Sequence, residues 1–190
     1  MKRFLAAVFS LLVTGGLAEA ASLDIDANDY SVQGRIIAPI LEDAYGRSEF
    51  NGRFLLNEDE DLILGSFGLD FFGQVAPGLD LGVGLETLGG EKESRLEDQE
   101  LLAVALGARL SYYPPGFYDR LRFMAKAFYA PKVLSFLDLD RALETGLRVS
   151  YAITTRVDLY AEYQRIGADF DDLGDQTIDE GIRLGFMATF

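Results

Sequence analysis

The feature that most constrains this chain is a strict alternation of apolar and polar residues, which recurs in runs of about 8 to 13 residues. In residues 101–112, for example, Leu102, Leu106 and Leu110 share one face, and Arg109 lies on the other. A period of two is typical of a β-strand whose two sides meet different surroundings. Helical periodicity is poor along the same segments. The chain is therefore predicted to be all-β.

The polar faces of these runs carry small residues and balanced charges. Six cations oppose six carboxylates on them: Arg53, Arg109, Arg122, Lys126, Arg148 and Arg183 against Asp70, Asp80, Glu86, Glu144, Asp158 and Glu162. Such faces can satisfy one another inside a small barrel while the apolar faces meet lipid. The alternative interpretation is the solvated outer face of a soluble barrel, whose apolar face would be its core.

The first twenty residues are predicted to be a secretory signal peptide. Lys2 and Arg3 precede the apolar segment Phe4–Val13, and Ala18–Ala20 has the small-residue pattern of a cleavage site. The apolar segment is too short to span a bilayer. We therefore expect a signal peptide at residues 1–20 and an outer-membrane β-barrel domain at residues 21–190 of a Gram-negative bacterium.

The connections between runs are expected to alternate in length. Short turns are predicted at residues 76–78, 114–116 and 154–155, and longer acidic stretches at residues 57–61, 89–100, 132–141 and 168–175. Short periplasmic turns and longer outer loops are typical of outer-membrane barrels. Aromatic residues near the strand ends are expected to form belts at the two membrane interfaces: Phe71, Phe72, Tyr112, Tyr113, Phe117, Tyr118, Phe128, Tyr129, Tyr151 and Phe190.

The fold class expected from these patterns is a closed antiparallel up-and-down transmembrane β-barrel of 8–10 strands. Eight strands are predicted at about 48–57, 61–74, 79–88, 101–113, 120–130, 142–152, 156–167 and 177–190. Residues 21–37 alternate in one phase before the turn-prone Asn28–Asp29 and in the other phase after it. A hairpin there would make ten strands, which we favour, and a periplasmic extension would leave eight.

Two segments resemble a known family. Residues 127–150, AFYAPKVLSFLDLDRALETGLRVS, and residues 157–170 are similar to the YfaZ-type outer-membrane proteins, which are small exported proteins of Gram-negative bacteria. The similarity extends to the acidic residues 58–61 and to the closing strand. The resemblance implies an outer-membrane barrel, and it supplies neither an activity nor functional residues.

The composition argues against several classes of function. The chain has no Cys and no His, so catalytic triads with histidine, cysteine nucleophiles and thiolate metal sites are excluded. The carboxylates Glu144, Asp158 and Glu162 lie among cations, which salt-bridged barrel packing explains without catalysis. A net charge of −14 argues against a nucleic-acid partner. We therefore expect no enzyme activity and no cofactor.

The acidic loop segments are expected to be solvated, repulsive surfaces. Asp169, Asp171, Asp172 and Asp175 form one such set, and Glu58–Asp61 forms another. Their oxygens also offer ligands for divalent cations, which would bridge them to the phosphates of lipopolysaccharide. Outer-membrane lipid and lipopolysaccharide are the partners expected from this arrangement.

Three functions are open at this point. The leading hypothesis is a structural or interaction role for a barrel whose lumen is filled by charged side chains. The alternatives are a narrow outer-membrane pore for small solutes and a soluble periplasmic ligand-binding barrel. The candidate functional residues form a lumen charge network that gates or seals the barrel: Arg109, Arg122, Lys126, Glu144, Arg148, Asp158, Glu162 and Arg183.

Overall fold

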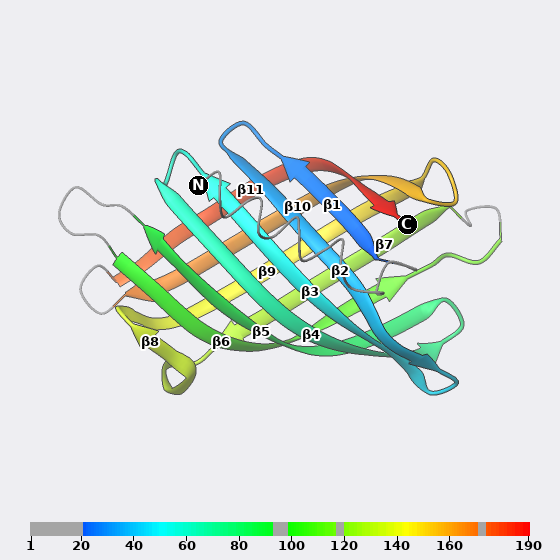
Figure 1. Cartoon of the computed structure of the whole chain (residues 1–190), viewed down its shortest axis with the longest axis horizontal. Helices are drawn as coiled ribbons and strands as arrows, with labels where there is room; N and C mark the ends of the chain where they lie inside the picture. Colours follow the sequence, from blue (N-terminus) through cyan, green and yellow to red (C-terminus); the bar gives the residue numbers. More distant parts are fainter. Residues whose placement is uncertain (1–20, 93–98, 117–119, 171–173) are drawn as a thin grey trace.

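The computed structural model describes residues 21–92, 99–116, 120–170 and 174–190, and almost all of them lie in one antiparallel sheet (Figure 1). The strands are β1 (Ser22–Ala27), β2 (Ser31–Asp43), β3 (Gly46–Asn57), β4 (Leu62–Ala76), β5 (Leu79–Lys92), β6 (Gln99–Tyr112), β7 (Leu121–Ala130), β8 (Ser135–Leu137), β9 (Leu139–Ala152), β10 (Val157–Phe170) and β11 (Gly174–Thr189). One short 3-10 turn, η1 (Lys132–Leu134), precedes β8. No helix among these residues is long and apolar enough to cross a membrane.

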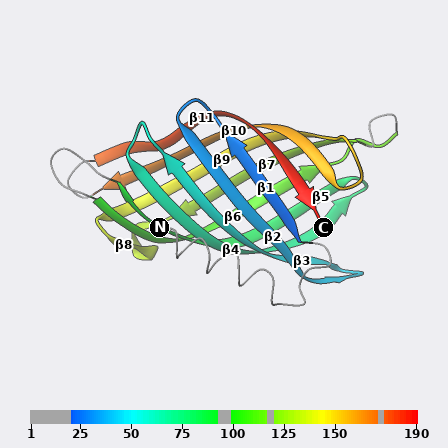
Figure 2. The same ribbon diagram turned by 45° about the horizontal axis from the view of Figure 1, so that its top comes forward.

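Ten of the strands close into a barrel, which confirms the expected fold class. The closing seam joins β1 to β11 (Figure 2). In this seam Ser22 lies opposite Thr189. Each of the other neighbours in the barrel is antiparallel, and β8 is an addition that pairs with residues Leu101–Ala103 of β6 beyond the end of β7. The N-terminal hairpin β1–β2 therefore belongs to the barrel, and the eight-strand alternative is wrong.

The two ends of the barrel differ in their connections. The end that holds Ser22 and Thr189, here called the termini end, also carries the β2–β3, β4–β5, β6–β7 and β9–β10 connections. The opposite end is called the loop end. The expected strict alternation of short and long connections is wrong, because the residues 113–120 between β6 and β7 span as many positions as the residues 131–138 at the loop end. Several acidic stretches expected as loops instead continue the strand ladder, as β5 does to Lys92.

The outer surface of the barrel is apolar. Rows of large side chains point outward from the barrel strands, and Phe67, Leu147 and Leu184 are each more than half exposed. A surface of this extent is unstable in water and suits a lipid environment. The soluble ligand-binding alternative is therefore set aside, because it requires the apolar face on the inside.

The aromatic residues divide between the two faces. Phe71, Tyr112, Tyr129, Tyr151 and Phe190 point outward as expected. The belt assignment is wrong for Phe72 and Phe128, which are buried in the lumen because they fall in the inward phase of β4 and β7. Tyr113 lines a cavity at the termini end, and Phe117 and Tyr118 lie outside the described residues.

Candidate functional site

The lumen changes character along the barrel axis. On β6, the inward side chains run from Ser111 and Arg109 near the termini end to Ala105, Ala103 and Leu101 near the loop end. The strands β4, β5, β7 and β10 show the same change from polar to apolar. The alternation predicts a lumen filled by charged side chains, and the apolar part of the lumen is a correction to that prediction. Leucines beside charged loop segments are also typical of the ordinary ends of strands, so the sequence pattern does not distinguish the two.

The apolar part forms a continuous buried cluster, here called the plug. Its members are at most 5% exposed: Leu55, Leu62, Leu64, Leu88, Leu101, Ala103, Ala105, Phe128, Ala130, Leu139, Ala142, Ile166, Ala168, Phe170 and Ile178. They come from eight barrel strands, β3 to β7 and β9 to β11. The plug lies in the part of the lumen toward the loop end, where its side chains are shielded from water.

The polar part is one connected charge network, here called the lumen network. Six cations and seven carboxylates are linked by ion pairs within it: Arg35, Arg53, Arg109, Lys126, Arg148 and Arg183 with Asp24, Asp26, Asp70, Glu86, Glu144, Glu162 and Asp179. The charges come close to cancelling. Buried charges are tolerated only when paired and hydrogen-bonded, and this arrangement meets that condition.

Glu162 of β10 is a centre of the network. It accepts from Arg35 at 3.0 Å, from the Nε of Arg148 at 2.7 Å, and lies 3.2 Å from the Nζ of Lys126. Arg148 also reaches Asp24 on β1 at 2.7 Å. Strand β1 is therefore linked to β9 by a side-chain ion pair, in addition to its backbone pairing with β11.

Tyr160 extends the network by hydrogen bonding. Its hydroxyl donates to Asp24 and, at 2.9 Å, to Asp26. The guanidinium of Arg148 lies 3.7 Å from the centre of the Tyr160 ring, close enough for a cation–π contact. The ring has room because Gly185 lies opposite it on β11, where an added Cβ would come within 2.5 Å of the ring.

Most of the predicted site residues meet in this network. Arg109, Lys126, Glu144, Arg148, Glu162 and Arg183 belong to it. Arg122 and Asp158 instead form a separate, half-buried pair at 2.5 Å near the termini end. Those two residues belong to the mouth of the lumen rather than to its centre.

Sequence reasoning missed four members of the network. Arg35, Asp24 and Asp26 lie on the N-terminal hairpin, for which the prediction of ten strands does not say which face points inward. The spacing of two between Asp24 and Asp26, and between Gln33 and Arg35, is the signal that points to them.

Asp179, the fourth, depends on a β-bulge. Ile166 pairs with Asp179 and Gly167 pairs with Thr177, so Ile178 is an extra residue in β11. The bulge turns two consecutive side chains inward, and both Ile178 and Asp179 are buried. Ile178 joins the plug, and Asp179 binds Arg183 at 2.7 Å. Simple alternation cannot predict two adjacent inward residues.

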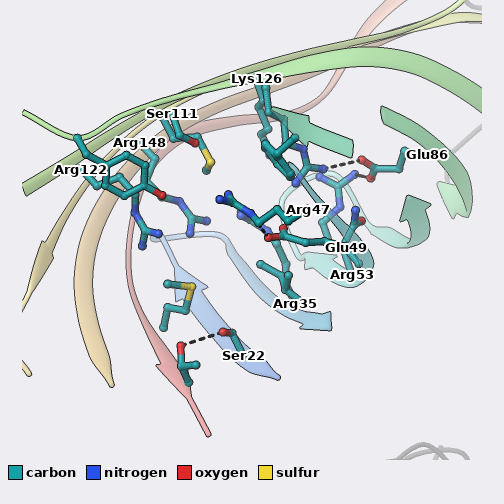
Figure 3. Close-up of a pocket in the computed structure, with 18 of the residues that line it drawn as sticks. Ser22, Arg35, Arg47, Glu49, Arg53, Glu86, Ser111, Arg122, Lys126 and Arg148 are labelled. Carbon is teal, nitrogen blue, oxygen red and sulfur yellow. Dashed lines mark hydrogen bonds and ion pairs between the residues drawn. The ribbon is translucent and has the colours of Figure 1, made fainter. Parts of the chain in front are cut away.

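A cavity of about 370 Å³ lies between the network and the termini end (Figure 3). Ser22, Met187 and Thr189 line its outer part at the closing seam, where the Ser22 and Thr189 hydroxyls are hydrogen-bonded at 2.9 Å. The cations that line the cavity are Arg35, Arg47, Arg53, Arg109, Arg122, Lys126 and Arg148. Its carboxylates are Glu42, Glu49, Glu86 and Glu144.

The acidic loop residues form no evident ion site in the part of the chain that the structure describes. No group of three or more carboxylates there is placed to hold a metal ion. Asp171 and Asp172 lie outside the described residues. Binding of divalent cations or lipopolysaccharide at these loops stays a prediction.

The closed barrel, the apolar outer face and the charged, plugged lumen define a small outer-membrane β-barrel protein. The chain belongs to the YfaZ family: it matches the family described as YfaZ precursor over residues 1–190, the whole chain. The word precursor agrees with an exported protein that is made with a signal peptide. The family resemblance seen in the sequence is thereby confirmed, and the protein is assigned to the outer membrane.

Two further comparisons were made, with curated sequences and with solved structures. No curated protein sequence matches the chain. Among solved structures, it is similar to the KdgM porin, with 9% identity, a TM-score of 0.43, and coverage of 90% of this chain and 99% of that one. It is also similar to the outer membrane channel DcaP of Acinetobacter baumannii, with 14% identity and a TM-score of 0.47, over 87% of this chain and 54% of that one.

Proposed function

We propose that this protein is a sealed, non-catalytic outer-membrane barrel with a structural or interaction role. The observation that carries the proposal is the plug, in which Leu55, Leu64 and Ala105 are at most 1% exposed. A water-filled passage needs polar walls, and an ion that entered the plug would lose its hydration without gaining a partner. The wide lumen of a ten-strand barrel is thus filled rather than open.

The lumen network supports the same function. Its ion pairs join the closing strand β1 to β9, join β2 to β10, and join β3 to β9 across the interior. Cross-links between strands that are not neighbours resist deformation of the barrel wall. A rigid, sealed barrel is suited to stabilising the membrane or to presenting its loops to a partner.

A narrow pore is the second candidate, and one observation favours it. The cavity of about 370 Å³ extends inward from the termini end, so part of the route through the lumen is already open. Conduction would then require the plug side chains to move aside. This candidate and the leading one differ in whether the folded protein carries current.

Single-channel recording in planar bilayers tests the proposal. The mature chain, residues 21–190, is refolded in detergent, and its folded state is checked by heat-modifiable migration on a gel. The expected result is no conductance from the folded wild-type chain. A double variant of the plug, Leu64→Ser with Leu101→Ser, is expected to conduct, whereas the outward control Leu69→Ser is expected to stay silent. Steady conductance steps from the wild type would establish the pore instead.

A further inference from the structure

We propose that the cavity at the termini end is a binding site for a compact anion with two or more charges, of the phosphate or polycarboxylate class. This inference goes beyond the proposed function, because a sealed barrel needs no ligand. It is carried by the cationic side chains that line the cavity and by the incomplete hydrogen bonding of two of them, Arg35 and Arg109.

The wall of the cavity has the opposite charge from the chain as a whole. The chain has a net charge of −14. Among the described residues, however, seven cationic side chains line the cavity against four carboxylates. Asp24 and Asp26, which pair with Arg148 and Arg35, do not line it. The charged side chains that a solute meets there are therefore mostly cationic.

Two of the cavity-lining arginines are more exposed than the most deeply buried carboxylates of the lumen network. The side chains of Asp24 and Glu162 are at most 1% exposed, whereas those of Arg109 and Arg122 are 15% and 27% exposed. Figure 3 shows Arg35, Arg122 and Arg148 reaching into the same space.

Arg109 is loosely paired with carboxylates, although its guanidinium also lies 5.0 Å from the centre of the Phe128 ring. Its two ion pairs, to Asp70 and Glu86, are both 3.4 Å long, whereas Arg53 holds Glu86 at 2.8 Å. Its Nε has no hydrogen-bond partner among the described residues. A guanidinium has five donors in a planar fork that fits carboxylate and phosphate oxygens, so an anion could bond Arg109 better than its present neighbours do.

Access is from one side only. The cavity reaches Ser22 and Thr189 at the strand ends, and the plug closes the other end of the lumen. In the topology expected for outer-membrane barrels, with both termini inside, that side is the periplasm. The ligand would therefore be a periplasmic solute, held without being transported.

Isothermal titration calorimetry of the folded mature chain in uncharged detergent tests the site. Sodium pyrophosphate and sodium citrate are titrated separately, and the tighter of the two identifies the phosphate or the carboxylate class. We expect one saturable site whose affinity falls as sodium chloride is added. Arg109→Gln is expected to weaken binding by about tenfold or more, the loss expected for one charge-assisted hydrogen-bonding group.

The matched control is Arg141→Gln, which removes an arginine from the outer surface near the loop end, where Arg141 pairs with Asp169 at 2.7 Å. It is expected to leave the affinity unchanged. Absence of saturable heat with both anions would overturn the proposal, as would equal weakening in the two variants or no weakening in Arg109→Gln. Because conductance is measured independently, failure here leaves the sealed-barrel proposal to its own test.

Discussion

Arg53 of β3 and Glu144 of β9 form a two-point ion pair across the lumen, with Nη1–Oε1 and Nη2–Oε2 distances of 2.6 and 2.7 Å. The two strands are not neighbours in the barrel. Glu144 also binds Lys126 of β7 at 2.7 Å, and Arg53 also binds Glu86 of β5 at 2.8 Å. Side chains from four strands thus meet at one buried point.

Replacing Glu144 by Gln is expected to destabilise the barrel strongly. It leaves Arg53 and Lys126 short of a buried countercharge, a loss of about 3–5 kcal/mol in the free energy of unfolding. Urea titration with the heat-modifiable gel shift as readout measures this loss. The control Glu91→Gln, at the exposed end of β5, should change the midpoint little. Equal midpoints for the two variants would show that the network adds no stability.

The plug is expected to contribute packing energy that lipid-facing residues do not. Leu64→Ala removes a fully buried side chain and should lower the free energy of unfolding by about 2–5 kcal/mol. Leu69→Ala, on the outward face of the same strand, loses only lipid contact and should cost less. The same urea titration compares them. If the outward variant proves the more damaging, the plug is not a packed core.

Gly107 is expected to be intolerant of any side chain. An added Cβ would lie 2.3 Å from the backbone oxygen of Ala127 and 2.4 Å from the ring of Phe128. Gly107→Ala should therefore destabilise the barrel by about 1–3 kcal/mol, as overpacking does. At Gly34 a Cβ meets nothing within 4 Å. Gly34→Ala should fold like the wild type, and similar losses at both positions would contradict the packing argument.

Deleting Ile178 is expected to remove the bulge without reversing the strand. Asp179 would keep its partner Ile166, and Thr177 would keep Gly167, so the inward and outward faces of β11 stay in phase. The variant should fold, with a stability loss of about 2–5 kcal/mol from the missing plug side chain. Deleting Ile182 instead moves every side chain on one side of the deletion to the opposite face of β11, so this variant should not fold. Both are checked by the heat-modifiable shift.

Much of the barrel follows from local pattern. The inward and outward faces of β6, β7 and β9 agree with the alternation in the sequence, and six of the eight predicted site residues lie in the lumen network. The eight predicted strands and the predicted hairpin around Asn28–Asp29 together give the ten strands of the barrel. Connection lengths could not be predicted, because charges and glycines such as Gly89 and Gly90 are typical of loops, yet here they continue a ladder.

The sequence by itself determined the class of this protein, because the side-chain period of a strand is a property of the backbone that each short segment carries alone. Only the tertiary structure decided which charges meet. The pairing of Arg53 with Glu144 depends on barrel closure, which brings together residues 91 positions apart. Closure also gathers leucines and alanines from separate strands into the plug. Local alternation says which side chains point inward, and the closed geometry alone sets their height and their neighbours.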